Sequence, residues 1–327
     1  MRSYSYADIM ITGSWSLEEL LPSEAPASNK PAIAISLLDA PPCEPSSSDW
    51  IHQWSAEFGG MRIALSGKGG SFLLRFPGLA DFVISRDGHH IEAWPALTTD
   101  IETLSHLLLD QVLPRVLAQR GRHVLHAGAV RVGGQAIAFM GSSGSGKSTL
   151  TASLHAAGYP LLSDDSLVLI PGDRFIPALA TYPSLRLLPD AVSGLYAKPP
   201  ALAPVAHYTK KQRVMVTHMA AEANNPLALA AICILEPKDK VVTANVSLTR
   251  LKQQEACMAI IGNSFQLDLT DRRRVADAFA HACRISERLP VFSLAYSRDF
   301  MRLPEVHAVI LNQLNERAMG NQKCGQI

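Results

Sequence analysis

The sequence has almost no net charge and no long apolar run, and each absence excludes a class of protein. Thirty Lys plus Arg against 29 Asp plus Glu leave a formal net charge of +1, so no overall field favours nucleic acid or an acidic membrane surface. The longest apolar run, Pro226 to Leu235, covers about half of a membrane-spanning helix. We therefore expect neither nucleic acid nor a membrane as a partner.

Cysteines are few and scattered. The five of them are odd in number, widely spaced and never arranged as Cys-x-x-Cys, which argues against a disulfide framework and against structural zinc. The first residues also lack a basic segment followed by an apolar one, the pattern of a secretion signal. These absences predict a cytoplasmic protein. Apolar residues make up 47% of the 327 residues, which is ample for a globular core.

The chain divides by pattern into four segments. The first contains short β-like runs, and its clearest element is a hairpin formed by 81–85 and 90–93 across a turn at 86–89. The others are a helix, a larger domain and a short tail. The predicted segments are 1–97 (small β-rich N-terminal domain), 98–121 (connecting helix), 122–318 (larger domain) and 319–327 (C-terminal tail).

The connecting helix has recognisable ends. Thr99 and Glu102 have the spacing of a capping box, Gly121 is typical of a helix end, and Pro114 predicts a kink between them. Further helical patterns follow in the larger domain, at 248–261, 271–288 and 304–314.

The strongest motif is a glycine-rich octet that runs from Gly141 to Ser148 and satisfies Gly-x-x-x-x-Gly-Lys-Ser/Thr. An apolar run at 136–140 precedes it, typical of a buried strand, and a helical pattern at 148–157 closed by Gly158 follows. Strand, loop and helix in this order indicate a P-loop rather than a Gly/Ser-rich loop that matches by chance. The candidate nucleotide-binding residues are Gly141, Ser142, Ser143, Gly144, Ser145, Gly146, Lys147, Ser148 and Thr149.

The residue types of this loop suit phosphate chemistry. Glycines let the backbone curl, so that successive N–H groups converge on a phosphate chain at a helix N-terminus. We expect Lys147 to neutralise the β- and γ-phosphates of ATP, and Ser148 to offer its hydroxyl to Mg²⁺. The loop by itself therefore predicts binding of a nucleoside triphosphate.

A histidine upstream is predicted to lie beside the loop. The segment 125–132 leads through Gly133 and Gly134 into the P-loop strand, which is the signature of a two-residue hairpin. Opposed positions then sum to 267, which places His126 across from Gly141. His126 either polarises a phosphate or tunes a neighbouring acid, or it is a hydrogen-bonded core histidine.

Two adjacent carboxylates follow the loop after one helix and one strand. Asp164 lies 17 residues after Lys147, and Asp165 follows it. Such a pair can hold Mg²⁺ and accept the proton of an attacking hydroxyl, because mutual repulsion raises one pKa while the metal keeps the other group ionised. The alternative is an Asx-type turn that leaves a strand. The short distance from the P-loop favours the functional interpretation.

These three motifs carry a resemblance to a known family. With His126-Ala127-Gly128, Gly141 to Thr149 and Leu162-Ser163-Asp164-Asp165 in this order, the chain resembles the C-terminal kinase domain of HPr kinase/phosphorylase. It is most similar to divergent relatives, which include lasso-peptide tailoring kinases, over roughly 120 to 300. The resemblance implies an α/β fold, with a P-loop core of the HPr kinase/phosphoenolpyruvate carboxykinase type at 122–318 and a small β-rich N-terminal domain.

The resemblance also implies an activity. It implies an ATP-dependent serine kinase that uses Mg²⁺, assembles as a homo-oligomer and phosphorylates a hydroxyl of a protein or peptide, such as a biosynthetic precursor peptide. In these roles His126 assists, Lys147 and Ser148 hold triphosphate and metal, Asp164 supports the site and Asp165 takes the proton. The implied catalytic residues are Asp165, Asp164, His126 and Lys147, and the implied metal ligands are Ser148, Asp164 and Asp165.

Other interpretations stay open beside this one. The chain could be a nucleotide-binding switch or sensor without phosphotransfer, or a small-molecule kinase. Nothing between Arg186 and Thr217 matches the Glu-Ile-Arg-Gly-x-Gly segment of HPr kinases, so we expect neither HPr as acceptor nor the reverse reaction. Arg186 itself, within an apolar run, either snorkels or pairs with an anion near the site. The charged run 210–213 either grips a phosphate or an acidic peptide, or is a solvated face.

Overall fold

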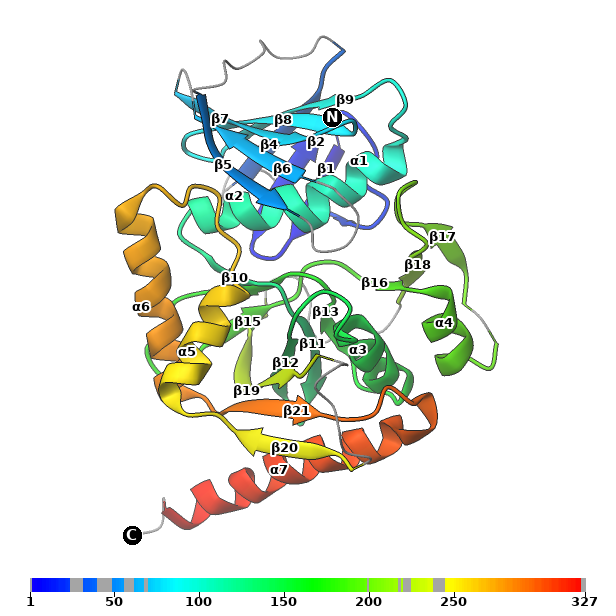
Figure 1. Ribbon diagram of the computed structural model, residues 1–327, viewed down its shortest axis with the longest axis vertical. Helices are drawn as coiled ribbons and strands as arrows, with labels where there is room; N and C mark the ends of the chain where they lie inside the picture. Colours follow the sequence, from blue (N-terminus) through cyan, green and yellow to red (C-terminus); the bar gives the residue numbers. More distant parts are fainter. Residues whose placement is uncertain are drawn as a thin grey trace.

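Two nine-stranded sheets and one three-stranded sheet organise the computed structural model, which is a mixed α/β structure (Figure 1). The residues that the structure describes are 2–23, 32–39, 49–55, 62–67, 70–198, 200–216, 219, 225–237 and 245–324.

The first sheet is built from the N-terminal segment, in the order β3-β1-β2-β4-β9-β8-β7-β6-β5. The predicted hairpin is confirmed as β8 and β9, with Ile84 opposite Ile91. Buried and half-buried side chains alternate along β8, as a strand with one face on the core requires. The strands are β1 (Arg2–Tyr6), β2 (Ile9–Gly13), β3 (Leu21–Pro22), β4 (Ala32–Leu37), β5 (Trp50–Ser55), β6 (Arg62–Ser66), β7 (Ser71–Phe76), β8 (Ala80–Ser85) and β9 (His90–Pro95).

The connecting segment is helical but irregular. α1 (Ile101–Leu107) passes into a π-helical turn, η2 (Leu108–Val112), and then into α2 (Leu113–Gln119). Pro114 stands at the start of α2, directly after the π-helical turn, and has no N–H to donate. The kink predicted at this residue stays a prediction.

The ends of this helix are partly as predicted. Gly121 follows it with a positive φ of 84° and confirms the predicted stop. The predicted capping box was wrong, because Asp100 is the N-cap residue and its side chain accepts the N–H of Thr103 at 2.8 Å. The Thr99 hydroxyl instead donates to the carbonyl of Leu79, which ties the helix start to the first sheet.

The second sheet has the path β10-β14-β15-β19-β12-β11-β13, and β21 and β20 extend it beside β19. Strand β12, which leads into the glycine-rich loop, lies parallel to β19, and β19 lies parallel to β21. The predicted hairpin register is confirmed from Val132–Gln135 to Gly128–Phe139. The strands are β10 (His123–Leu125), β11 (Gly128–Val132), β12 (Gln135–Met140), β13 (Leu161–Ser163), β14 (Leu167–Leu169), β15 (Pro177–Leu179), β19 (Leu227–Leu235), β20 (Ser247–Arg250) and β21 (Val291–Ala295).

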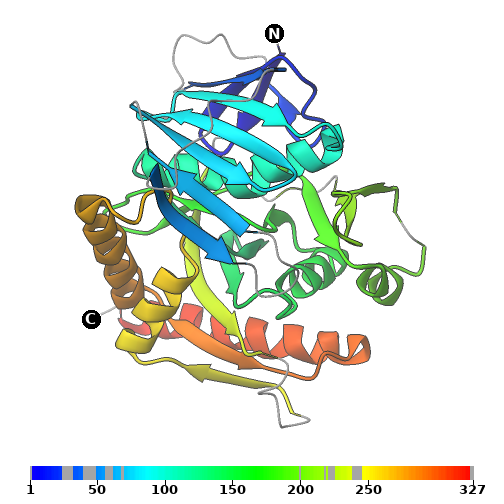
Figure 2. The same cartoon turned by 45° about the horizontal axis from the view of Figure 1, so that its top comes forward.

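Helices flank this sheet (Figures 1 and 2). The predicted helices at 271–288 and 304–314 are confirmed, and the latter continues to Cys324. The helix predicted from 248 begins only at Gln253, because 247–250 form β20, which pairs with β21. The helices are α3 (Lys147–Ala156), α5 (Gln253–Gly262), α6 (Arg272–Arg288) and α7 (Leu303–Cys324), with a 3-10 turn, η4 (Phe300–Arg302).

A three-stranded sheet, in the order β16-β18-β17, stands beside α3 together with α4 (Pro189–Leu195). Its strands are β16 (Ser184–Leu187), β17 (Leu202–Pro204) and β18 (Gln212–Met215).

The connecting helix packs against both large sheets. Figure 1 shows α1 and α2 between the N-terminal sheet and the rest of the molecule. The largest apolar cluster contains residues of the first sheet and of this helix, and also Val124, Val168, Leu179 and Tyr182 of the larger domain. Burial of one continuous apolar cluster therefore joins the N-terminal segment to the domain that holds the glycine-rich loop.

Candidate active site

The glycine-rich loop connects β12 to α3, as its sequence predicted. Gly141, Gly144 and Gly146 have positive φ values of 146°, 75° and 92°, which side chains rarely tolerate. A Cβ atom on Gly141 would lie 2.8 Å from the carbonyl oxygen of Leu235 and 2.8 Å from the Ser145 hydroxyl. Glycine at position 141 is therefore required by both conformation and space.

Lys147 begins α3 and turns back over the loop. Its Nζ donates to the carbonyl oxygens of Gly141 at 2.8 Å and Ser142 at 3.1 Å, and the residue is only 6% exposed. Burial, reinforced by the cation of Lys211, lowers the pKa of Lys147. The ammonium group lies at the N-terminus of α3. The helix dipole favours anions at this end of the helix.

A cavity of about 280 Å³ opens beside this loop. Residues from several other parts of the fold also line it, among them His126 after β10, Asp165 after β13 and Arg186 on β16. The predicted residues that line the cavity are His126, Ser143, Gly144, Gly146, Lys147, Ser148, Thr149 and Asp165. The predicted residues Gly141, Ser142, Ser145 and Asp164 are not among those that line it.

His126 lies at the cavity but does not pair with Gly141. The ladder between β11 and β12 ends at Gly128, and the N–H of His126 donates instead to the carbonyl of Asn263 at 2.7 Å. The expected pairing was therefore wrong, because the chain bends away from β12 towards the segment after α5. The proximity of His126 to the loop nevertheless holds, since both border the cavity.

The protonation state of His126 follows from its surroundings. Its Nδ1 lies 3.0 Å from the carbonyl oxygen of Asp165. A carbonyl only accepts, so Nδ1 carries the proton and Nε2 keeps a lone pair. Burial and the cation of Lys147 lower the pKa of His126 to about 4. The imidazole is therefore neutral at pH 7.

The two aspartates occupy different environments. Asp165 borders the cavity, whereas Asp164 is fully buried behind it, with Oδ2 accepting the N–H of Arg186 at 2.8 Å. Oδ1 of Asp164 has no hydrogen-bond partner within the described part of the chain. Burial and the charge of Asp165 raise the pKa of Asp164 to about 7. Burial also acts to raise the pKa of Asp165, but Lys211, followed by His126, holds it below its ordinary value.

A carboxylate pair with separated pKa values can divide acid and base roles. Asp165 stays ionised and can accept a proton, while Asp164 is poised to titrate near neutrality. This division agrees with the expectation that repulsion raises one pKa of the pair, and it leaves the ionised carboxylate on the side of the cavity.

Gly128, in the motif His126-Ala127-Gly128, packs where strand and helix approach most closely. A Cβ atom there would lie 2.2 Å from Oγ1 of Thr151 on α3 and 3.2 Å from the carbonyl oxygen of Asp164. Glycine therefore allows β11, α3 and the aspartate pair to meet at one point.

The sequence did not reveal the buried ionic network behind the cavity. Arg186 is 1% exposed and pairs with Asp110 of η2 at 2.6 Å and with Glu19 at 2.8 Å. Of its two predicted behaviours, pairing with anions is the one that occurs. Asp110 interrupts an apolar helical pattern, and this interruption was the sequence signal that could have indicated a buried ionic network. Lys211 of the charged run lies at the cavity, whereas its neighbour Lys210 is exposed.

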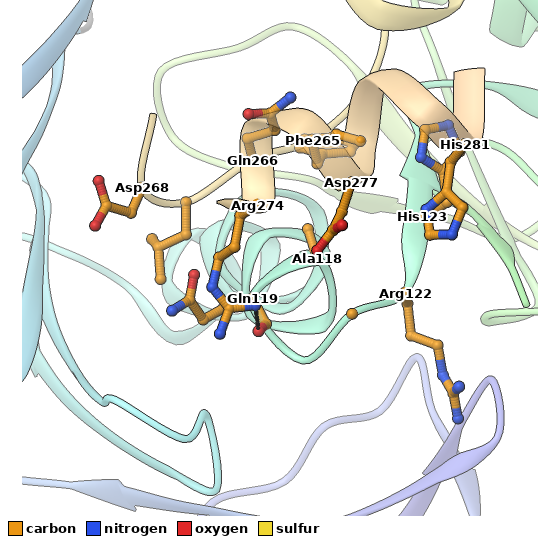
Figure 3. Close-up of a pocket in the computed structure, with 13 residues that line it drawn as sticks. Ala118, Gln119, Arg122, His123, Phe265, Gln266, Asp268, Arg274, Asp277 and His281 are labelled. Atoms are coloured by element: carbon orange, nitrogen blue, oxygen red, sulfur yellow. Dashed lines mark hydrogen bonds between the residues drawn. The ribbon is translucent and has the colours of Figure 1, made fainter. Parts of the chain in front are cut away.

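A second, smaller cavity of about 60 Å³ lies between α2, β10 and α6 (Figure 3). Figure 3 shows the rings of His123 and His281 beside one another and Arg274 beside Gln119. None of the predicted site residues borders it. Within the described ranges, no group of three or more His, Cys, Asp or Glu side chains is arranged to hold a metal ion. The described helices include none that is long and apolar enough to span a membrane.

No protein-family model and no curated protein matches the sequence. Among solved structures, the chain is similar to the Hpr(Ser) kinase/phosphatase from Coxiella burnetii, with 11% sequence identity and a TM-score of 0.32. The similarity covers 59% of this chain and 98% of that chain. The chain thus has a distant structural similarity to an HPr kinase/phosphatase. A proposal for its function rests on the residues that line the cavity.

Proposed function

We propose that the protein is an ATP-dependent kinase that transfers the γ-phosphoryl group to a serine hydroxyl of a protein or peptide. One observation supports this most strongly: a glycine-rich loop, a buried lysine, a neutral histidine and an ionised carboxylate border the same cavity. Binding a nucleotide needs only the loop and the lysine. The carboxylate adds a group that can take a proton from an acceptor.

The triphosphate is expected to lie on the loop that precedes α3. Positive φ values at Gly144 and Gly146 turn the backbone around this space, and the N-terminus of α3 faces it. Lys147 supplies the cation for the β- and γ-phosphates, and Lys211, which also lines the cavity, supplies a second one.

The cavity also fits a magnesium ion. Ser148 and Asp165 border it with a hydroxyl and a carboxylate, and Mg²⁺ prefers such oxygen donors. Behind them, Oδ1 of Asp164 has no hydrogen-bond partner among the described residues and is a third candidate oxygen. When bound, Mg²⁺ would neutralise charge on the phosphates.

The proposed transfer needs one base. Asp165 takes the proton of the serine hydroxyl, the serine oxygen forms a bond to the γ-phosphorus, and the bond from phosphorus to the β-phosphate oxygen breaks to release ADP. His126 assists by donating to the backbone carbonyl of Asp165, which fixes the base in place. Asp164 supports the site through the N–H of Arg186.

The test is acceptor-dependent phosphotransfer. The protein is incubated with Mg·ATP and, in separate reactions, with serine-containing peptides or with small alcohols. Mass spectrometry then reads the added phosphate and its position. Lys147→Ala is expected to abolish transfer, and Lys210→Ala, which changes an exposed lysine away from the cavity, to retain it. Tight ATP binding without labelling of any acceptor would support a nucleotide switch instead, and labelling of small alcohols alone would indicate a small-molecule kinase.

A further inference from the structure

The N-terminal sheet reaches the back of the cavity through one acidic residue. Glu19 lies between β2 and β3 and is 4% exposed. Its Oε2 accepts hydrogen bonds from the Arg186 guanidinium at 2.8 Å and from the Ser184 hydroxyl at 2.5 Å. Its Oε1 lies 3.3 Å from a guanidinium nitrogen of Arg213. Glu19 therefore joins the N-terminal segment to two strands of the three-stranded sheet, β16 and β18.

The Arg186 guanidinium has a third carboxylate within reach. Its Nε lies 2.6 Å from Oδ2 of Asp110, but 3.9 Å from Oδ2 of Asp165. The first distance is a full ion pair, and the second is only the outer limit of one. Glu19 and Asp110 thus hold the guanidinium more closely than Asp165 does.

A buried guanidinium must be compensated by carboxylates. When Glu19 is neutralised, the guanidinium retains Asp110, and Asp165 is the nearest further carboxylate among the described contacts. Closer pairing with Arg186 would occupy an oxygen of Asp165 that the proposed base needs for the acceptor proton.

We propose that Glu19 is a positioning residue for phosphotransfer: together with Asp110 it holds Arg186 away from Asp165, so that the N-terminal sheet completes the active site. This inference rests on the proposed kinase function. A second contact links the N-terminal sheet to the site. The hydroxyl of Tyr6 on β1 lies 2.8 Å from the hydroxyl of Ser166, which directly follows Asp165.

The test compares Glu19→Gln with Glu18→Gln in the full chain. The neighbouring Glu18 side chain is 75% exposed and lies 3.6 Å from Arg213, which makes it a matched control. For each variant, kcat and KM for ATP are measured with a labelled peptide acceptor, and the affinity for Mn²⁺ is measured by electron paramagnetic resonance with a non-hydrolysable ATP analogue. Affinity for that analogue without metal, together with the thermal melt, reports whether the loop and fold are intact.

Glu19→Gln is expected to lower kcat about tenfold and Mn²⁺ affinity severalfold, with KM for ATP within about twofold of wild type; Glu18→Gln should leave all of these unchanged. Equal behaviour of the two variants in both assays would overturn the inference. If the wild-type protein phosphorylates no acceptor but Glu19→Gln still weakens Mn²⁺ binding, the kinase proposal fails while the positioning role stands.

If Glu19→Gln does not fold, a second variant tests whether the N-terminal sheet places Asp165. Tyr6→Phe keeps the ring and removes the hydroxyl, which contacts the Ser166 hydroxyl at 2.8 Å and donates to the carbonyl oxygen of Leu109 at 3.3 Å. It should lower kcat severalfold at unchanged affinity for the metal-free analogue. A Tyr6→Phe variant with wild-type kcat and wild-type Mn²⁺ affinity would contradict a role of the N-terminal sheet in placing Asp165.

Discussion

Replacing Gly128 with alanine tests how closely β11 packs against α3 beside the aspartate pair. The added Cβ would lie 2.2 Å from Oγ1 of Thr151 and 3.2 Å from the carbonyl oxygen of Asp164. Thr151 is fully buried and the carbonyl belongs to the backbone, so neither neighbour can simply swing into solvent. Overpacking of this kind costs about 2 kcal/mol, within the usual range of 1–3.

The expected result is a lower melting temperature. At roughly 1.5 °C for each kcal/mol in a chain of 327 residues, Gly128→Ala should melt about 3 °C below wild type. Calorimetry or far-UV circular dichroism measures this. Gly262→Ala is the matched control, because its Cβ would meet no atom within 4 Å at the end of α5, and a change of less than about 1 kcal/mol is expected there.

A double variant identifies the atom responsible. Oγ1 of Thr151 has no hydrogen-bond partner among the described residues, so Thr151→Ala loses little more than a methyl group, about 1 kcal/mol. Combined with Gly128→Ala it removes the closest contact and should recover part of the lost stability, so the two effects are not additive. A stable Gly128→Ala variant, or strictly additive losses in the double variant, would refute the proposed packing.

Three further predictions concern individual groups. Lys211→Ala should weaken binding of Mg·ATP about fivefold to tenfold in calorimetric titrations, because its cation faces the cavity, whereas Lys210→Ala should not. Burial and Lys147 lower the pKa of His126 to about 4, so as pH falls the His126 side chain takes up a proton in the unfolded chain before it does so in the folded one. The free energy of unfolding should therefore decrease as pH falls from about 6.5 towards 4. Urea melts of His126→Gln should show a smaller decrease over the same pH range. The sulfur atoms of Cys257 and Cys283 lie 3.2 Å apart, so oxidation by diamide should join them in a disulfide with the loss of two hydrogens, which mass spectrometry detects. Because burial raises the pKa of Cys257 to about 11, the oxidation should be faster at alkaline pH. A cysteine pair that stays reduced at alkaline pH would contradict this contact.

Features set by neighbouring residues could be predicted from the sequence. The strand, loop and helix around Gly141 follow from an apolar run, three glycines and a helical pattern within about twenty residues. The turn at Gly133 and Gly134 likewise determines the register of β11 and β12. One helix and one strand then return the chain to the cavity at Asp165, which is why part of the site could be foreseen.

Features set by distant partners could not be predicted. The register of β11 and β12 was extrapolated to His126, but the pairing of these strands ends at Gly128 and the His126 N–H bonds to the carbonyl of Asn263. Asn263 is 137 positions from His126 (263 minus 126), and no local sequence pattern indicates so distant a partner. Glu19 and Arg186 are 167 residues apart in sequence, and their pairing depends on how the N-terminal sheet packs. A lone arginine in an apolar run signals a buried anion without identifying it.

The most direct test of the central claim is the rate of phosphotransfer by Asp165→Asn. Asparagine keeps the shape of the side chain but cannot take the acceptor proton, and loss of a general base typically lowers the rate about 10²–10⁴-fold. We predict such a loss of kcat with a serine peptide, while affinity for the nucleotide without metal, measured by fluorescence titration, stays within about threefold of wild type. Full transfer activity in Asp165→Asn would contradict the assignment of Asp165 as the base and the phosphotransfer site built around it.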